Sequence, residues 1–193
     1  MAPTLTLRAC VVLLAWLASA AATAEVWQAD QKSGALRFVA TQAGARFSGH
    51  FGDFQVRLDF DPKEPANARL DVTIATRSAN TADTDRDEVL RSQDFFWVAR
   101  FPQAVYHAVG LKREGKAWVT SGTLTLRGVT QPIAVRFELK PRQGSFTMQG
   151  GATLRRLEFG VGQGDWASTT WIGDPVDVAF ELKLARDSAA VSP

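Results

Sequence analysis

The sequence predicts an all-β protein of about eight antiparallel strands, with one short helix inserted between them. From Leu36 onward, apolar and polar residues alternate with period two in segment after segment, as in strands with one buried face and one solvated face. Clusters of Gly, Pro, Asp and Gln separate these segments and predict turns. Residues 83–91 break the rhythm and have the composition of a helix.

The alternation is clearest in residues 54–60, 70–74, 133–139 and 176–184. In each of them every second residue is apolar and most of the residues between are polar, so each strand is expected to be half buried. Parallel sheets, which are covered on both faces, have unbroken apolar runs instead. The pattern therefore favours antiparallel pairing, but a closed barrel and a two-sheet sandwich both remain possible.

The helical segment is expected to close one end of the sheet structure. Asp85 is the expected N-cap, with Glu88 three residues later as its capping partner. The aromatic residues Phe95, Phe96 and Trp97 follow directly. A short helix with an aromatic cluster, placed between strands, suits a plug or lid at one end of a barrel, and we expect it there.

Residues Met1 to Ala24 have the three-part layout of a secretory signal. Arg8 provides a positive charge, an apolar run extends from Val11 to Ala22, and Ala22-Thr23-Ala24 is a small-residue cleavage site. The apolar run is shorter than the roughly 20 residues that a membrane-spanning helix needs. We therefore expect cleavage after Ala24 and export of the chain.

The chain after Ala24 is expected to form one domain over residues 25–185, with a disordered polar tail over 186–193. It contains no cysteine, because the single one, Cys10, lies in the signal segment, so packing alone must stabilise the domain. The 22 Lys and Arg nearly balance the 20 Asp and Glu, which gives no indication of a nucleic acid partner or an anionic membrane. The polar end of the chain also argues against an outer-membrane barrel.

Few residues suit catalysis. The two histidines, His50 and His107, lie far apart; we expect His107 on the solvated face of a strand and His50 in a surface turn or bulge. The chain after the signal has no thiol, and neither a G-x-S-x-G nor an H-E-x-x-H motif is present. We therefore expect no catalytic residue, no metal and no cofactor.

Two motifs resemble ligand sites only in part. Asp83, Asp85 and Asp87 resemble the start of a calcium loop, but the sixth position, which must be glycine, is Glu88. Helix capping accounts for these carboxylates more simply. The glycines within 159–164 follow a strand-like run and open no helix, so they predict a bend or bulge rather than a phosphate loop.

Large apolar side chains on the buried faces are the remaining candidates for a binding site. A barrel of about eight strands can be filled by its own side chains or can hold one small ligand, and these residues would serve either structure. The residues expected to line an apolar pocket are Phe38, Phe54, Leu58, Phe95, Phe96, Tyr106, Trp118, Leu126, Phe137, Phe146 and Met148.

Several blocks of sequence have a recognisable order and spacing: Arg86-Asp87, 90–96, Phe101-Pro102, 122–132, 156–161 and 173–178. Together they resemble the YceI-like, polyisoprenoid-binding family of bacterial periplasmic proteins, over essentially the whole chain after Ala24. The resemblance implies a lipocalin-like, eight-stranded antiparallel barrel with an elongated apolar pocket for an isoprenoid or another long-chain amphiphile. It also implies a location in the periplasm.

The chain departs from the family pattern at two places. Lys32-Ser33 stands where the family usually has a His-Ser pair, and Trp97 stands where an aspartate often follows the paired phenylalanines. Polar contacts near the mouth of the pocket are therefore expected to differ from those of the family.

These observations favour a non-catalytic periplasmic protein that carries or stores a long-chain lipid, such as a polyisoprenoid or a quinone. One alternative is an interaction module with a filled barrel, acting on a membrane electron-transfer or stress-response partner. Another is an enzyme of lipid chemistry that uses Tyr106 as an acid or orienting group. We expect no nucleic acid partner and no stable membrane insertion, and both a monomer and a homodimer are compatible with the sequence.

Overall fold

Twelve β segments and one α-helix make up most of the described part of the chain, residues 25–187, in this computed structural model. The predicted signal segment 1–24 and residues 188–193 of the predicted tail lie outside the described residues. The segments are β1 (Glu25–Asp30), β2 (Gly34–Gln42), β3 (Ala45–Phe51), β4 (Phe54–Phe60), β5 (Arg69–Ala75), β6 (Ala79–Asn80), α1 (Thr84–Arg91), β7 (Gln103–Val109), β8 (Lys112–Glu114), β9 (Ala117–Leu126), β10 (Val129–Arg142), β11 (Ser145–Arg155) and β12 (Pro175–Arg186).

The segments combine into eight long antiparallel strands. The segments β1 and β2 are two parts of one interrupted strand, because both pair with β12. The next two segments, β3 and β4, pair with β2 and β1 and form a second interrupted strand. In the same way β5 and β6 pair with β4 and β3 and form a third. The other five long strands are β7, β9, β10, β11 and β12, while the short β8 pairs only with β9. Pairing of Trp27 in β1 with Arg186 in β12 closes the sheet into a barrel. The predicted antiparallel eight-stranded fold is confirmed.

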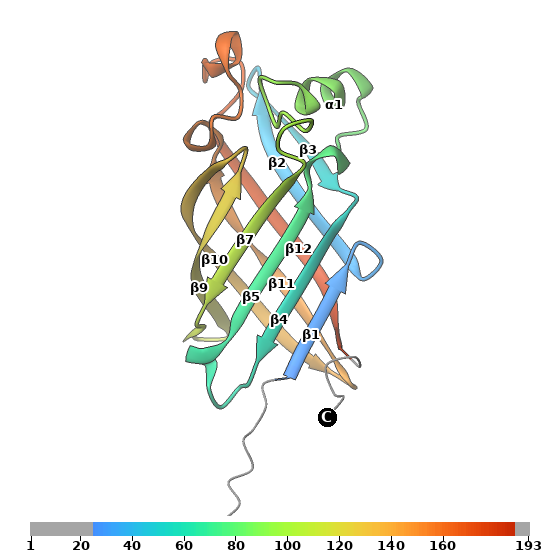
Figure 1. Cartoon of the computed structure of the whole chain (residues 1–193), viewed down its shortest axis with the longest axis vertical. Coiled ribbons are helices and arrows are strands. Elements are labelled where there is room, and N and C mark those ends of the chain that lie inside the picture. The colour runs from blue at the N-terminus through green and yellow to red at the C-terminus, as the bar shows by residue number, and fades with distance from the viewer. Residues whose placement is uncertain (1–24, 188–193) are drawn as a thin grey trace, which may run out of the picture.

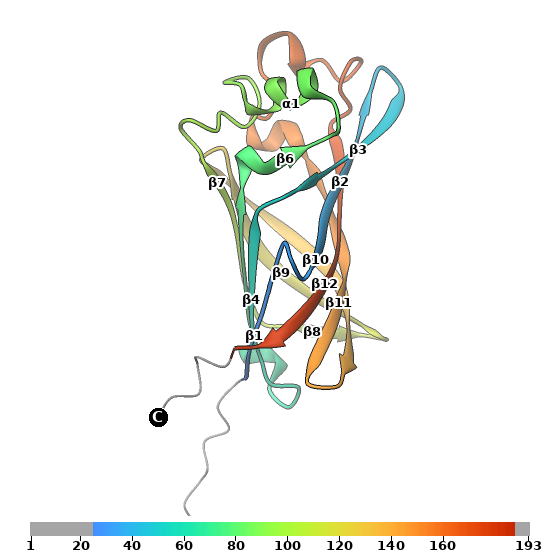
Figure 2. The same ribbon diagram turned by 90° about the vertical axis from the view of Figure 1, so that its right-hand side faces the viewer.

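The two ends of the barrel differ. Figures 1 and 2 show α1 and the connection between β11 and β12 over one end, whereas the two ends of the described chain lie at the other. The predicted domain boundary at residue 185 lies one residue before the end of β12, and the backbone N–H of Asp187 donates a hydrogen bond to the carbonyl of Val26. No helix within residues 25–187 has the length and apolarity needed to cross a membrane.

The period-two pattern decides which side chains enter the barrel. In β4, Phe54, Val56, Leu58 and Phe60 are buried and the residues between them are exposed or half-buried. The strands also approach each other closely at Gly122, where an added Cβ would lie 2.4 Å from the carbonyl oxygen of His107. A side chain at this position would push β9 away from β7, so the sequence has glycine there.

Aromatic side chains fill the half of the barrel nearest the chain ends. The rings of Trp27 and Phe146 meet edge-on with centroids 4.6 Å apart, and those of Phe60 and Trp118 meet in the same way at 5.3 Å. Phe137 on β10 pairs with Trp118 on β9 and is 1% exposed. This half is therefore a packed core that needs no disulfide.

Helix α1 begins differently from the sequence prediction. The N-cap is Asp83, not Asp85: its side chain accepts a hydrogen bond of 3.0 Å from the backbone N–H of Arg86. Asp85 lies in the first turn, and the predicted capping partner Glu88 is exposed. Acidic residues alternate here, so the sequence offers two possible capping registers. The extended backbone of Asp83 (φ −139°, ψ 108°) selects one of them.

Candidate ligand-binding cavity

The half of the barrel next to α1 is hollow. A cavity of about 440 Å³ lies there, and side chains from all eight long strands line it. Most of the lining side chains are aliphatic or aromatic, including Leu36, Val72, Ile74 and Val135. The barrel therefore combines a filled half with an empty, apolar half.

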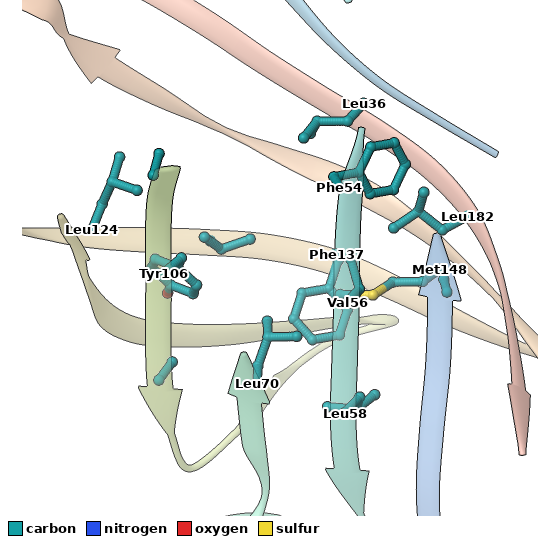
Figure 3. Packing of buried hydrophobic residues seen from close by; sticks show 14 of the residues in the cluster. Leu36, Phe54, Val56, Leu58, Leu70, Tyr106, Leu124, Phe137, Met148 and Leu182 are labelled. Carbon is teal, nitrogen blue, oxygen red and sulfur yellow. The ribbon is translucent and has the colours of Figure 1, made fainter. Parts of the chain in front are cut away.

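The predicted pocket residues divide between these two halves. Seven of them line the cavity: Phe38, Phe54, Phe95, Phe96, Tyr106, Leu126 and Met148. The other four, Leu58, Trp118, Phe137 and Phe146, do not line it and are packed in or next to the filled half. Figure 3 shows Phe54, Val56 and Leu58 following one another along β4; the first two line the cavity and Leu58 does not. Alternation assigns these side chains to the inner face, but it carries no information about their height along the barrel axis.

The sequence analysis missed many of the aliphatic residues that line the cavity and all of the polar residues at its opening. The aliphatic residues, such as Val135 and Leu182, carried the same period-two signal as the aromatic ones and could have been included. The polar residues Gln42, Asp83, Asp85 and Arg86 had no such signal. Asp83, Asp85 and Arg86 line the cavity because α1 lies across the end of the barrel, which local pattern does not reveal.

Two chain segments cover the cavity and are joined to each other. After α1, the carbonyl oxygen of Asp94 accepts hydrogen bonds from the backbone N–H groups of Gly162 (2.7 Å) and Gln163 (2.9 Å). Beside these bonds, the rings of Phe95 and Trp166 are in edge contact, and both side chains line the cavity. The predicted lid therefore exists, and it includes the β11–β12 connection as well as α1.

Arg156 holds the β11–β12 connection in place from inside. Its guanidinium is buried and donates to the backbone carbonyls of Val161 (2.8 Å), Trp166 (2.8 Å), Ile172 (2.7 Å) and Gly173 (3.0 Å). Burial lowers the pKa of Arg156, an effect that the nearby Asp174 carboxylate opposes. The guanidinium thereby satisfies carbonyl groups of a connection that has little regular structure.

The carboxylate of Asp174 completes this arrangement. It accepts a hydrogen bond of 3.0 Å from the backbone N–H of Leu157 and forms an ion pair of 2.9 Å with Arg155. Both ends of the β11–β12 connection are thus tied together, and its inner surface is held against the cavity.

Tyr106 is a polar group within the apolar wall. Its hydroxyl donates a hydrogen bond of 3.1 Å to the carbonyl oxygen of Ile133 on β10. Desolvation raises the pKa of Tyr106 from 10.0 to about 12, so the phenol loses its proton only in strongly alkaline solution. The hydroxyl is therefore used within the barrel wall, and its pKa is poorly matched to acid–base catalysis.

The cavity opens beside the start of α1, where exposed residues join its lining. Asp83 and Asp85 are exposed, and Arg86 is partly exposed next to them. The Arg86 guanidinium lies 4.4 Å from the centroid of the Phe47 ring, and its Nη2 is 3.0 Å from Oδ2 of Asp83. Its Nε is buried and has no hydrogen-bond partner among the described residues.

The histidines lie away from the cavity. His107 is on the outer face of β7, as predicted, and its Nδ1 contacts Asp71 on β5. His50 is exposed on the regular strand β3, so the predicted turn or bulge is wrong. Within residues 25–187, no group of three or more His, Cys, Asp or Glu side chains is arranged to hold a metal ion.

The two departures from the family pattern are also outside the cavity lining. Lys32 is exposed in the interruption between β1 and β2. The Trp97 ring meets Phe101 edge-on at 5.7 Å, and Arg100 lies over it at 4.8 Å. Neither residue contributes to the mouth, where the structure places the side chains of α1 instead.

A family model described as a YceI-like domain matches residues 27–184. The chain belongs to the YceI-like domain family. The match begins within β1 and ends within β12. The resemblance inferred from short blocks of sequence therefore extends over nearly the whole described domain. The protein named YceI from Salmonella arizonae and the one from Salmonella paratyphi B are each 42% identical to this chain over 137 residues, which is 71% of this chain and 71% of theirs.

Solved structures share the YceI-like barrel. Burkholderia cenocepacia BcnA superposes with a TM-score of 0.77 at 24% identity, covering 81% of this chain and 99% of BcnA. A polyisoprenoid binding domain from Saccharophagus degradans gives a TM-score of 0.66 at 16% identity, covering 85% of this chain and 99% of that one. The Campylobacter jejuni YceI protein gives 0.62 at 26% identity, covering 72% and 84%. These likenesses agree with the barrel, which alternation alone could not distinguish from a sandwich.

Proposed function

We propose that this YceI-like protein binds a long-chain lipid of the polyisoprenoid or quinone class in the barrel cavity, and carries or stores it without altering it. The observation that carries the proposal is the cavity of about 440 Å³ with its apolar lining. Its volume lies within the roughly 300–1,000 Å³ of small-molecule sites. Each methylene group buried there would contribute about 0.8 kcal/mol, so an apolar chain alone supplies the binding energy.

The arrangement of the cavity supports a ligand that enters with its tail first. Met148 and Leu182 pair with each other two positions from Phe146, which belongs to the filled half, while the polar side chains of Asp83 and Asp85 lie at the opening. A molecule with an apolar chain and a polar end matches a cavity that is apolar inside and polar at its opening. The Saccharophagus degradans neighbour, described as a polyisoprenoid binding domain, supports the same class of ligand.

The two alternatives have less support. An interaction module with a filled barrel would have no need for the hollow half. An enzyme that uses Tyr106 would need a hydroxyl free to exchange protons, whereas this one donates to Ile133 and has a pKa of about 12. A carrier or store needs neither property.

We also propose that residues 1–24 direct export and that the protein acts in the periplasm. The layout of this segment supports the proposal, with Arg8 before an apolar run and a small-residue site at Ala22-Thr23-Ala24. Expression of the full chain in a Gram-negative host tests it. We expect the protein in the periplasmic fraction with Glu25 as its first residue, and an unprocessed cytoplasmic chain would contradict it.

Native mass spectrometry of the same purified protein tests lipid binding. We expect the protein to carry a bound molecule. After solvent extraction, the mass of that molecule should correspond to an intact long-chain lipid. An empty protein that also takes up no isoprenoid or quinone when these are offered would refute the proposal. Recovery of a chemically altered lipid after incubation with a defined one would instead favour the enzyme.

A matched pair of variants locates the binding. Ala152 on β11 lines the cavity, while Ala179 on the adjacent β12 is exposed on the outer face. Ala152→Phe fills part of the cavity and is expected to reduce the bound lipid strongly. Ala179→Phe adds the same atoms outside and should leave lipid binding unchanged. Circular dichroism checks that both variants keep the barrel, and equal lipid content in the two would place the ligand elsewhere.

A further inference from the structure

Aromatic rings from strands that are not neighbours meet inside the barrel. The ring of Phe60 on β4 contacts that of Trp118 on β9 with the centroids 5.3 Å apart, although β5 and β7 lie between these strands in the sheet. The ring of Phe146 on β11 contacts Phe60 at 6.5 Å and Trp27 on β1 at 4.6 Å, and β11 pairs with neither β4 nor β1. Inward-facing side chains that meet in this way span the lumen. We call Trp27, Phe60, Trp118 and Phe146 the aromatic floor.

The cavity ends where the aromatic floor begins. On β11, Met148 lines the cavity, and Phe146 is the next inward-facing residue, two positions earlier. On β4, Val56 lines the cavity, whereas Leu58 does not and is 0% exposed, and Phe60 follows. The residues directly beyond the lining are therefore packed core, and the cavity is closed on this side.

The length of strand that borders the cavity gives its depth. On β12 the lining extends from Val176 to Leu182, and their cross-strand partners on β11, Leu154 and Met148, are also lining residues. Figure 3 shows the Met148 and Leu182 end. At about 3.3 Å per residue and a strand tilt of about 40°, the six steps from residue 176 to residue 182 correspond to a depth of roughly 15 Å. An eight-stranded barrel has room for one small ligand, so an apolar chain would enter it extended.

The length of an isoprenoid chain can be compared with this depth. An extended chain advances about 1.2 Å per bond, as the polypeptide backbone does, and each isoprene unit adds four bonds, or roughly 5 Å. Three units therefore extend over the depth of the cavity, and a fourth lies at the opening. Carbon atoms beyond these remain in water and contribute no further burial.

We propose that the aromatic floor acts as a stop, which limits the bound apolar chain to about three or four isoprene units. Phe146 holds the central position in this floor, because its ring contacts both Trp27 and Phe60. The inference rests on the proposed function, since it names the chain length of the lipid that the cavity would hold.

Prenols of increasing length test the limit. Geraniol (C10), farnesol (C15), geranylgeraniol (C20) and hexaprenol (C30) share one headgroup and differ only in the number of isoprene units. Binding to the processed protein, stripped of lipid, is measured by competition against a fluorescent lipid. We expect the affinity to rise about tenfold or more from C10 to C15, and to change less than about threefold from C20 to C30.

Two substitutions should move the stop in opposite directions. Phe146→Ala removes the ring that joins Trp27 to Phe60, and it should raise the affinity for C30 relative to that for C20 about tenfold. Val56→Phe adds volume at the closed end of the cavity, and it should lower the affinity for C20 relative to that for C15 about tenfold. Each ratio is compared with the same ratio in the parent protein, so differences in the solubility of the prenols cancel.

Phe101→Ala is the matched control. It removes the same ring atoms as Phe146→Ala, but Phe101 packs against Trp97 and does not line the cavity, so both affinity ratios should stay unchanged. Circular dichroism checks that each variant is folded. If Phe146→Ala does not fold, Phe146→Leu takes its place and should shift the ratio in the same direction by a smaller factor.

The outcomes separate this inference from the proposed function. If the parent protein binds C30 tenfold more tightly than C20, the chain is not stopped, and the inference is wrong while lipid binding stands. If either the Phe146 variant or Val56→Phe keeps the ratios of Phe101→Ala, the aromatic floor does not set the limit and the inference is equally overturned. If none of the prenols binds, both proposals fail.

Discussion

The rings of Phe95 and Trp166 meet edge-on with their centroids 5.6 Å apart, although they are 71 positions apart in the numbering. Phe95 follows α1, and Trp166 belongs to the connection between β11 and β12. Together with the hydrogen bonds from Gly162 and Gln163 to Asp94, this contact makes one cover from two segments. A ligand in the proposed binding site would be enclosed by both of them.

Replacement of Trp166 by alanine is expected to speed up ligand release. An aromatic edge contact contributes about 0.5–1.5 kcal/mol, so its loss should raise the dissociation rate roughly two- to tenfold. Stopped-flow displacement of a fluorescent lipid measures that rate. Trp171→Ala is the control, because Trp171 lies in the same connection but is 62% exposed and does not line the cavity. Equal rates in the two variants would show that the cover does not limit release.

Arg156→Lys is expected to destabilise the fold. A lysine has one nitrogen with three N–H donors, so several of the carbonyls now bound by the guanidinium would lose their partner. We expect a loss of roughly 2–4 kcal/mol in the free energy of unfolding, measured by urea denaturation. Arg155→Lys is the matched control at the neighbouring position. Its side chain is 63% exposed, and its ion pairs with Asp174 and Glu158 should contribute less than about 1 kcal/mol.

The titration of Tyr106 can be observed directly, because it is the only tyrosine in the sequence. Burial raises its pKa from 10.0 to about 12, so the unfolded chain loses the phenolic proton first as the pH rises. The stability that depends on this group is complete below about pH 10 and falls by about 2–3 kcal/mol as the pH rises to 12. Tyrosinate absorbance of the folded protein should give the raised value.

Tyr106→Phe isolates this effect from other groups that titrate in alkaline solution. The variant loses the hydrogen bond to Ile133, so it should be about 1 kcal/mol less stable at neutral pH. Between pH 10 and 12 its unfolding free energy should fall less steeply than that of the parent protein, and the difference in slope belongs to Tyr106. Parallel curves for the two proteins would mean that the phenol is not desolvated.

Much of the barrel could be predicted from local pattern. The alternation in residues 54–60 places Phe54 and Leu58 on the inner face, and both are buried there. Pattern did not distinguish their surroundings: Phe54 lines the cavity and Leu58 is packed in the core. The difference depends on how far along the barrel each residue lies and on which side chains meet it from the opposite wall.

The candidate site could be predicted less well than the barrel, because its geometry depends on contacts between residues that are far apart in the sequence. The N-cap of α1 is Asp83 instead of the predicted Asp85, because the chain enters the helix from β6 in an extended conformation. That register places Asp83, Asp85 and Arg86 at the opening. No sequence pattern indicated the role of Arg156 either, because the carbonyl groups that it binds lie as far along the chain as Gly173.

The sequence by itself determined the antiparallel strands, the inner and outer faces of each, the inserted helix and the family, because these follow from residue spacing and from motifs within short segments. Only the tertiary structure decided that one half of the barrel is filled and the other hollow, and which polar groups surround the opening. The physical reason is that a cavity depends on the combined volume of side chains from eight strands, and no single strand contains that information.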